Sequence, residues 1–377
     1  MKILLVGPAS PLRGGIANFN ESLYAAFDKI HDTHIIGFSL QYPSLFFPGR
    51  TQYEKGASGS GIHSTNLINS INPLSWRAAA AGIVKMQPDC LVVHYWMPFF
   101  APALGSIIRQ VKSKIKVRVI GLLHNVEPHE GMSGGKRLGR YFFDSCDGFV
   151  TMSSTVLRDI KKTGINRPAV QIPHPVYDIF GEPVSRKFAC ENLGLNCDQK
   201  HLLFFGIIRS YKGLDLLLKA FANCKISHLN LKLIVAGEFY EHERKYLDLV
   251  ERLGLEHKIL FTRSFVPKEK VAQYFAASDL IVLPYLSATQ SGVTQIAYHF
   301  DKPMLVTNVG GLEDVVANGR VGYVCEKDPD EIASAIADFF ENNRSAEFVE
   351  NIKTEKKRFS WDAMVKGIEE LLKEINS

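Results

Sequence analysis

The stretch LLFFGIIRSYKGLDLLLKA, residues 202–220, contains an apolar run, a glycine, a short cationic turn and an amphipathic helical pattern, in that order. Residues 202–205 are typical of a fully buried parallel strand. Backbone N–H groups at a helix start favour negative charge, and the cations Arg209 and Lys212 on one turn favour a diphosphate over a single carboxylate. The stretch therefore predicts a strand, an anion-binding turn and a helix. An ordinary solvated turn is the alternative.

A second segment, residues 279–307, shows the pattern of a strand, a Pro/Ser-rich loop, a helix and another strand. Small and hydroxylic residues between 287 and 292 let a ligand approach the backbone closely. The N–H groups of Gly292, Val293 and Thr294 should be among the unpaired donors at the start of the helix. We expect a phosphate to fit there, although many helices without a ligand begin in the same way.

Strand and helix patterns alternate along the whole chain in two series, the second starting near residue 201. Such alternation predicts parallel sheets covered by helices on both faces. We therefore expect an α/β protein with two Rossmann-like, doubly wound domains that face a cleft. The first should span residues 1–175 together with 361–377, and the second 199–360. Residues 176–198, with few periodic apolar positions, are expected to form a linker and hinge.

These motifs resemble family 4 glycosyltransferases over most of the chain. The resemblance rests on GIIRSYKGLDLLLKAF, on ASDLIVLPY and KPMLVTNVGGLEDVV downstream, and on the N-terminal MKILLVGPASPLRGGIANFNESL. It implies the two-domain GT-B fold and a retaining transferase that uses a nucleotide sugar. In this family the last helix crosses back to the first domain, which would bury the apolar stripe on residues 361–376.

The resemblance also assigns roles to individual residues. Lys212 matches the diphosphate lysine. Arg209 stands three residues after Gly206, whereas the family has its arginine directly after the glycine, so a packing or acceptor role is the alternative for Arg209. His124 matches the histidine near the transferred sugar, with a hydrogen-bonded structural histidine as the alternative. Asn125 and Glu127 beside it are expected near the acceptor. The expected donor-binding residues are Gly14, Gly15, Gly206, Glu238, Thr289, Gln290, Ser291, Gly292, Val293 and Thr294.

One departure from the family lies in its donor motif, which has two glutamates eight residues apart. Ala288 and Ile296 occupy those positions here. Thr289, Gln290 and Gln295 are nearby and offer neutral hydrogen-bonding groups, which bind hydroxyls more weakly than carboxylates. A catalytically silent nucleotide-sugar-binding or regulatory relative therefore remains an alternative, as does a nucleotide-sugar epimerase of the same fold.

The expected chemistry needs no protein nucleophile, because in the family's retaining reaction a donor phosphate oxygen accepts the proton of the acceptor. Lys212, Arg209 and the helix start at 292–294 would stabilise the charge that grows on the leaving diphosphate. No metal or other cofactor is expected, and the nucleoside-diphosphate sugar is a co-substrate. The only Asp-x-Asp sequence, Asp328-Pro329-Asp330, is interpreted as a helix cap.

Charge is distributed unevenly over the 377 residues. Residues 1–180 contain 19 Lys/Arg and 11 Asp/Glu, whereas residues 181–377 contain 25 and 28. The basic half favours an anionic membrane surface or a phosphate-bearing acceptor, with a solvated helix face as the alternative. The acceptor is expected to be a glycan or a lipid-linked molecule used in surface polysaccharide or glycolipid synthesis, and no specific nucleic-acid partner is expected.

Cysteine usage and hydropathy give the expected location. The six cysteines show no metal or CxxC spacing, and the chain has neither a signal-peptide pattern nor an apolar run of the roughly 18 to 20 residues that crosses a bilayer. We therefore expect a cytoplasmic protein that associates peripherally with the inner face of the membrane.

Overall fold

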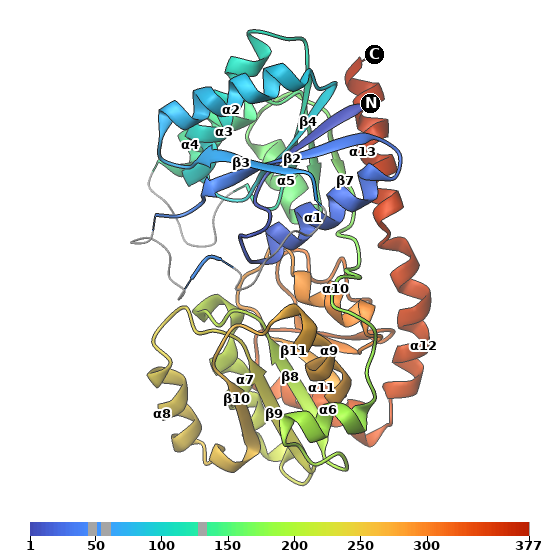
Figure 1. Cartoon of the computed structure of the whole chain (residues 1–377). Helices are drawn as coiled ribbons and strands as arrows, with labels where there is room; N and C mark the ends of the chain where they lie inside the picture. The colour runs from blue at the N-terminus through green and yellow to red at the C-terminus, as the bar shows by residue number, and fades with distance from the viewer. Residues whose placement is uncertain (44–50, 54–61, 127–133, 377) are drawn as a thin grey trace. The chain divides into compact units, whose positions relative to one another are not determined.

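The computed structural model describes residues 1–376 except 44–50, 54–61 and 127–133. The chain divides into two compact units (Figure 1). Unit 1 consists of Met1–Pro175 and Ser360–Ser377, and unit 2 of Val176–Phe359. Each unit is built on a parallel sheet, which confirms the predicted fold class.

Unit 1 contains a sheet of seven strands among the described residues, in the order β3-β2-β1-β4-β5-β6-β7. Every adjacent pair is parallel. All six residues of β4 are buried, as expected for a strand covered on both faces. The strands are β1 (Lys2–Val6), β2 (Asp32–Leu40), β3 (Ser64–Asn69), β4 (Cys90–Tyr95), β5 (Arg118–Leu123), β6 (Gly148–Thr151) and β7 (Ala169–Gln171).

The helices of unit 1 come from the N-terminal half of the chain and from its last residues. They are α1 (Gly15–Asp28), α2 (Pro73–Met86), α3 (Ala101–Lys112), α4 (Gly135–Phe143), α5 (Ser154–Lys162) and α13 (Trp361–Asn376). Helix α13 buries Met364, Ile368 and Leu371 and packs against α1, β6 and β7. A hydrogen bond joins Nε2 of His31 to Oε1 of Glu369 at 2.8 Å. The predicted return of the last helix to the first domain is therefore confirmed (Figure 1).

Unit 2 has a six-stranded parallel sheet in the order β10-β9-β8-β11-β12-β13, counted over the residues that the structure describes. Its core is made largely of leucine, isoleucine and valine side chains from the central strands and from α7. The strands are β8 (Lys200–Phe205), β9 (Leu231–Ala236), β10 (Ile259–Thr262), β11 (Leu280–Leu283), β12 (Met304–Thr307) and β13 (Gly322–Cys325).

The helices of unit 2 include one inside the segment expected as a linker. Helix α6 lies within residues 176–198, where Ser185 caps it by accepting a hydrogen bond from the Phe188 N–H. Hinge motion at this segment stays a prediction. Asp328 caps α11 by accepting from the Asp330 N–H, as predicted. The helices are α6 (Arg186–Leu193), α7 (Leu214–Phe221), α8 (Arg244–Arg252), α9 (Lys268–Ala277), α10 (Gly292–His299), α11 (Pro329–Glu341) and α12 (Ser345–Glu355).

Candidate functional site

Strand order shows where each unit can bind a ligand. In an open α/β sheet, ligands bind beyond the carboxyl ends of the strands at the point where the strand order reverses. That point lies between β1 and β4 in unit 1 and between β8 and β11 in unit 2. The turn that follows β8 carries Arg209 and Lys212, and the loop that follows β11 leads to α10. Both segments singled out in the sequence are therefore at the switch point of unit 2.

The turn after β8 is held in shape by two glycines. Gly206 has φ +104° and Gly213 has φ +67°, backbone conformations that side chains with a Cβ rarely adopt. A Cβ on Gly213 would also lie 1.9 Å from the carbonyl oxygen of Pro284. The loop after β11 bonds to the same turn, since the Leu286 N–H donates to the Tyr211 carbonyl at 2.7 Å. The two loops are thus packed tightly against each other.

Lys212 contacts the loop after β11 through Tyr285. Its ammonium donates to the Tyr285 hydroxyl at 2.7 Å and lies 4.2 Å from the centre of the tyrosine ring. Burial lowers the pKa of Lys212 and raises that of Tyr285, so the tyrosine keeps its proton at neutral pH. A half-buried cation with a lowered pKa is an electrostatic reason to expect an anion nearby.

The Tyr285 hydroxyl continues the chain of polar contacts to the start of α10. It lies 3.1 Å from Oγ of Ser291, which also accepts a hydrogen bond from the Val293 N–H at 3.3 Å. Lys212, Tyr285, Ser291 and the start of α10 therefore lie close together. The prediction that the Val293 and Thr294 N–H groups are unpaired is wrong, because Val293 donates to Oγ of Ser291 and Thr294 to its carbonyl oxygen, each at 3.3 Å. A cation beside a helix N-terminus suits a phosphate. The structure brings together the two halves of the predicted diphosphate site.

The sequence pattern does not distinguish Tyr285, which follows β11 in an LPY sequence, from a core aromatic residue. Its side chain is 1% exposed, so the aromatic ring gives no sign of its polar role. Only the contacts of its hydroxyl show that it joins Lys212 to Ser291.

Replacing Tyr285 with phenylalanine tests this link. The ring would stay beside Lys212, but the hydroxyl bonds would be lost, at a cost of about 1 kcal/mol in the free energy of unfolding. We expect the affinity for a nucleoside diphosphate, measured by calorimetry, to fall roughly fivefold, equivalent to about 1 kcal/mol. Tyr274→Phe, which removes a hydroxyl 3.1 Å from that of Thr262, is the matched control. Equal nucleoside-diphosphate affinities in the two variants would contradict the link.

The other predicted donor-site residues of unit 2 lie after β8, β9 and β11. The guanidinium of Arg209 lies over the ring of Tyr240, 5.7 Å from its centre, and its role toward a diphosphate stays a prediction. Glu238 is 4% exposed at the end of β9. Thr289 is buried and Gln290 half-buried. A Cβ on Gly310 would lie 1.5 Å from the Ala288 carbonyl oxygen, so the backbone there is closely packed.

Two residues, Ala288 and Ile296, occupy the positions at which the family has its pair of glutamates. Both are buried, each 6% exposed. Gln295, next to Ile296, is 0% exposed, and neither polar atom of its amide has a partner among the residues that the structure describes. A buried amide without partners is costly. Gln295 is thus the polar group on α10 that most needs a hydrogen-bonding ligand.

The predicted residues of unit 1 gather after β1 and β5. His124 follows β5, is 5% exposed, and its Nε2 lies 3.0 Å from Nδ1 of His94 on β4. Asn125 donates from Nδ2 to the Trp96 carbonyl at 3.5 Å. Gly14 has φ +125°, which requires glycine, whereas a Cβ on Gly15 would meet nothing within 4 Å. Glu127 lies outside the described residues.

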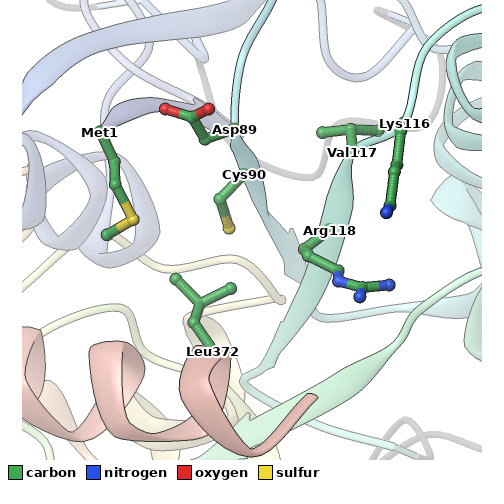
Figure 2. A pocket seen from close by; sticks show the side chains of 7 residues that line it. All are labelled: Met1, Asp89, Cys90, Lys116, Val117, Arg118 and Leu372. Carbon is green, nitrogen blue, oxygen red and sulfur yellow. The ribbon is translucent and has the colours of Figure 1, made fainter. Parts of the chain in front are cut away.

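A cavity of about 350 Å³ lies at the amino ends of β1, β4 and β5 in unit 1 (Figure 2). It lies away from the carboxyl ends where the predicted site residues stand, so it is separate from the candidate site. Its lining residues are Met1, Asp89, Cys90, Lys116, Val117, Arg118 and Leu372.

Comparison with known families follows the same division of the chain. A family model described as "Glycosyltransferase Family 4" matches residues 13–178, and one described as "Glycosyl transferases group 1" matches residues 185–359. The chain belongs to glycosyltransferase family 4. This confirms the resemblance seen in the sequence, and the protein is a glycosyltransferase.

One relative of this glycosyltransferase extends over its full length, and a second covers about three quarters of it. An uncharacterized glycosyltransferase of Methanocaldococcus jannaschii is 26% identical over 100% of this chain and 99% of its own. D-inositol 3-phosphate glycosyltransferase 2 of Catenulispora acidiphila is 27% identical over 73% of this chain and 68% of its own. The crystal structure of HepE from Anabaena in complex with UDP-glucose shares the fold, with a TM-score of 0.75, 18% identity and coverage of 99% and 100%.

Among the described residues, no cluster of three or more His, Cys, Asp or Glu side chains is arranged to hold a metal ion. Within the same part of the chain, no helix combines the length and apolar character needed to cross a membrane.

Proposed function

We propose that this glycosyltransferase moves a sugar, with retention, from a nucleoside-diphosphate sugar to a hydroxyl group of a glycan or lipid-linked acceptor. The observation that carries the proposal is the contact chain from Lys212 through Tyr285 to Ser291, which joins a cation to the start of α10 at the switch point of unit 2. The structure of HepE with UDP-glucose supports a uridine nucleotide as the first donor to test.

The chemistry asked of unit 2 is stabilisation of the leaving group. As the bond from sugar to phosphate breaks, negative charge grows on the diphosphate. The Lys212 ammonium and the N–H group of Gly292 at the start of α10 would offset that charge from positions fixed in advance. Gln295 would offer its buried amide to a hydroxyl of the donor, in place of the carboxylate that Ile296 replaces. No step in this scheme needs a metal.

The acceptor is proposed to carry phosphate. Helices α2, α3 and α4 pack beside one another in unit 1 and contain no Asp or Glu, but seven Lys and Arg: Arg77, Lys85, Arg109, Lys112, Lys136, Arg137 and Arg140. A positive surface of this kind attracts phosphorylated molecules and anionic lipids. The relative from Catenulispora acidiphila is named for a phosphorylated acceptor, inositol 3-phosphate.

The proposal is tested by assaying sugar transfer from UDP-glucose, GDP-mannose and ADP-glucose in buffer containing EDTA. Each donor is incubated with the protein alone, with inositol 3-phosphate, or with a diphosphate-linked lipid sugar. Transfer that needs an acceptor and keeps the anomeric configuration of the donor sugar, read by NMR, is the expected result. Conversion of the donor sugar without acceptor would instead favour the epimerase. Donor binding without turnover under any of these conditions would favour the silent relative.

Association with an anionic membrane gives a second testable prediction. Lys112 on α3 donates to Asp147 at 2.7 Å and is partly neutralised. Lys136 and Arg137 on α4 are exposed. Replacing both with glutamine should weaken binding to phosphatidylglycerol vesicles by about 2 kcal/mol, roughly thirtyfold, at low salt. The difference should shrink as salt rises.

A matched control removes two exposed cations from a helix that also contains acids. Arg244→Gln with Arg252→Gln on α8 takes away the same charge next to Asp248 and Glu251. Vesicle sedimentation should show little change for this control. An equal loss of binding in the two double variants would mean that net charge, not α4, determines the attraction.

A further inference from the structure

Three buried histidines of unit 1 surround one phenylalanine. The ring of Phe19, on α1, makes edge contacts with His94, His124 and His174 at centroid distances of 5.8, 5.5 and 4.9 Å. Each histidine is at most 5% exposed. Strands β4 and β5 are parallel neighbours in which His94 is paired with Leu122. His124, two residues further on, therefore comes beside His94.

The two rings share a single hydrogen bond. Nδ1 of His94 and Nε2 of His124 are 3.0 Å apart, and the ring planes differ by 21°. Burial lowers the pKa of His94 to about 3. Burial, followed by electrostatic interaction with the neighbouring rings of His94 and His174, also lowers the pKa of His124 well below its usual value. At neutral pH both imidazoles are uncharged, so each ring carries one N–H.

The direction of the shared hydrogen bond follows from the other nitrogen of His94. Its Nε2 is buried without a hydrogen-bond partner in the part of the chain that the structure describes. If His124 donated, the proton of His94 would have to sit on this Nε2 as an unpaired N–H, a rare and costly state in a protein interior. If His94 donates from Nδ1, only a lone pair of Nε2 goes unpaired.

We propose that His94 is a positioning residue that donates its Nδ1–H to Nε2 of His124 and so holds His124 in the tautomer with its proton on Nδ1. His174 offers a parallel, because its Nδ1 lies 2.8 Å from the Pro175 carbonyl, which can only accept. The consequence for the reaction, which rests on the proposed function, is that His124 meets a sugar or acceptor oxygen as an N–H donor. Its Nε2 is engaged by His94, so it does not act there as a base.

The test is the tautomer of His124, read from long-range ¹H–¹⁵N spectra of protein labelled at histidine, with His124→Gln to assign the signals. The wild type should show a protonated Nδ1 and an unprotonated Nε2. His94→Phe keeps the ring but removes the donor, and the proton of His124 should then redistribute toward Nε2. His94→Asn can place an amide N–H where Nδ1 was and should restore the wild-type pattern.

A proton on Nε2 of His124 in the wild type, or a His124 pattern that His94→Phe leaves unchanged, would overturn the proposal. If the phenylalanine variant fails to fold, the wild type and His94→Asn still decide the question. The spectra need no substrate, so a failure here is distinguishable from a failure of the proposed transfer activity. In a working assay, His94→Phe should lower kcat more than it raises the KM of the donor, and His94→Asn should recover most of that loss.

Discussion

Replacing Lys212 with alanine is expected to lower the affinity of the protein for UDP by about 2 kcal/mol, roughly thirtyfold, because a charge-assisted bond to the diphosphate is lost. Affinity for uridine, which has no phosphate, should change little. Calorimetric titration of both ligands measures the two effects. The contrast between them isolates the diphosphate contact from any general loss of structure.

The same helix offers the control. Lys219 is exposed near the end of α7, and Lys219→Ala should bind UDP as the wild type does. If Lys212→Ala and Lys219→Ala bind UDP equally well, Lys212 is not the diphosphate residue, and the contact with Tyr285 is only structural.

The pH dependence of UDP binding follows from the pKa of Lys212, which burial lowers in the free protein. A bound diphosphate favours the charged amine, so the pKa of Lys212 is higher in the complex than in the free protein. Above the lowered pKa, binding must therefore take up a proton, and affinity should fall as pH rises. In Lys212→Ala this part of the pH dependence should disappear.

Replacing Gly213 with alanine is expected to destabilise unit 2 by at least about 3 kcal/mol. The backbone conformation alone, at φ +67°, costs about 1 to 2 kcal/mol for a residue with a Cβ. The new Cβ would also meet the Pro284 carbonyl oxygen at 1.9 Å, so the turn and the loop before α10 must separate. Urea unfolding measures the loss, and UDP affinity should fall with it.

The variant Gly254→Ala separates the cost of the backbone conformation from the cost of the steric contact. Gly254 has φ +64°, but a Cβ there would meet nothing within 4 Å. Gly254→Ala should therefore show the conformational cost alone, about 1 to 2 kcal/mol. If both variants lose the same stability, the close approach of the two loops in the site is not tight enough to matter.

Much of this site could be predicted because its features are local in the sequence. An apolar strand, a glycine and a cationic turn lie within twelve residues of one another. Small and hydroxylic residues such as Ser291 indicate where a helix begins. Repeated strand and helix patterns gave the doubly wound fold. The apolar stripe on α13 showed that this helix must be buried, although its position on unit 1 came from the family resemblance.

The remaining features depend on contacts between distant segments. Tyr285 follows the buried aliphatic strand β11, and His94 lies within the buried strand β4, where a polar role leaves no mark on the pattern. The His94 and His124 pair depends on the alignment of β4 with β5. Strand β3 was not expected because its sequence STNLIN is polar and lies at a sheet edge, and α6 was not expected because its eight residues carry a weak period.

Thermal unfolding in the presence of UDP-, GDP- and ADP-sugars, compared between wild type and Lys212→Ala, tests the central claim most directly. A donor present at a hundred times its Kd should add about 2.7 kcal/mol to the stability of the wild type. We predict a raised Tm for one nucleotide series in the wild type and the loss of most of that gain in Lys212→Ala. An unchanged Tm with every sugar nucleotide, in a protein that is folded, would contradict a donor site built on Lys212, Tyr285 and the start of α10.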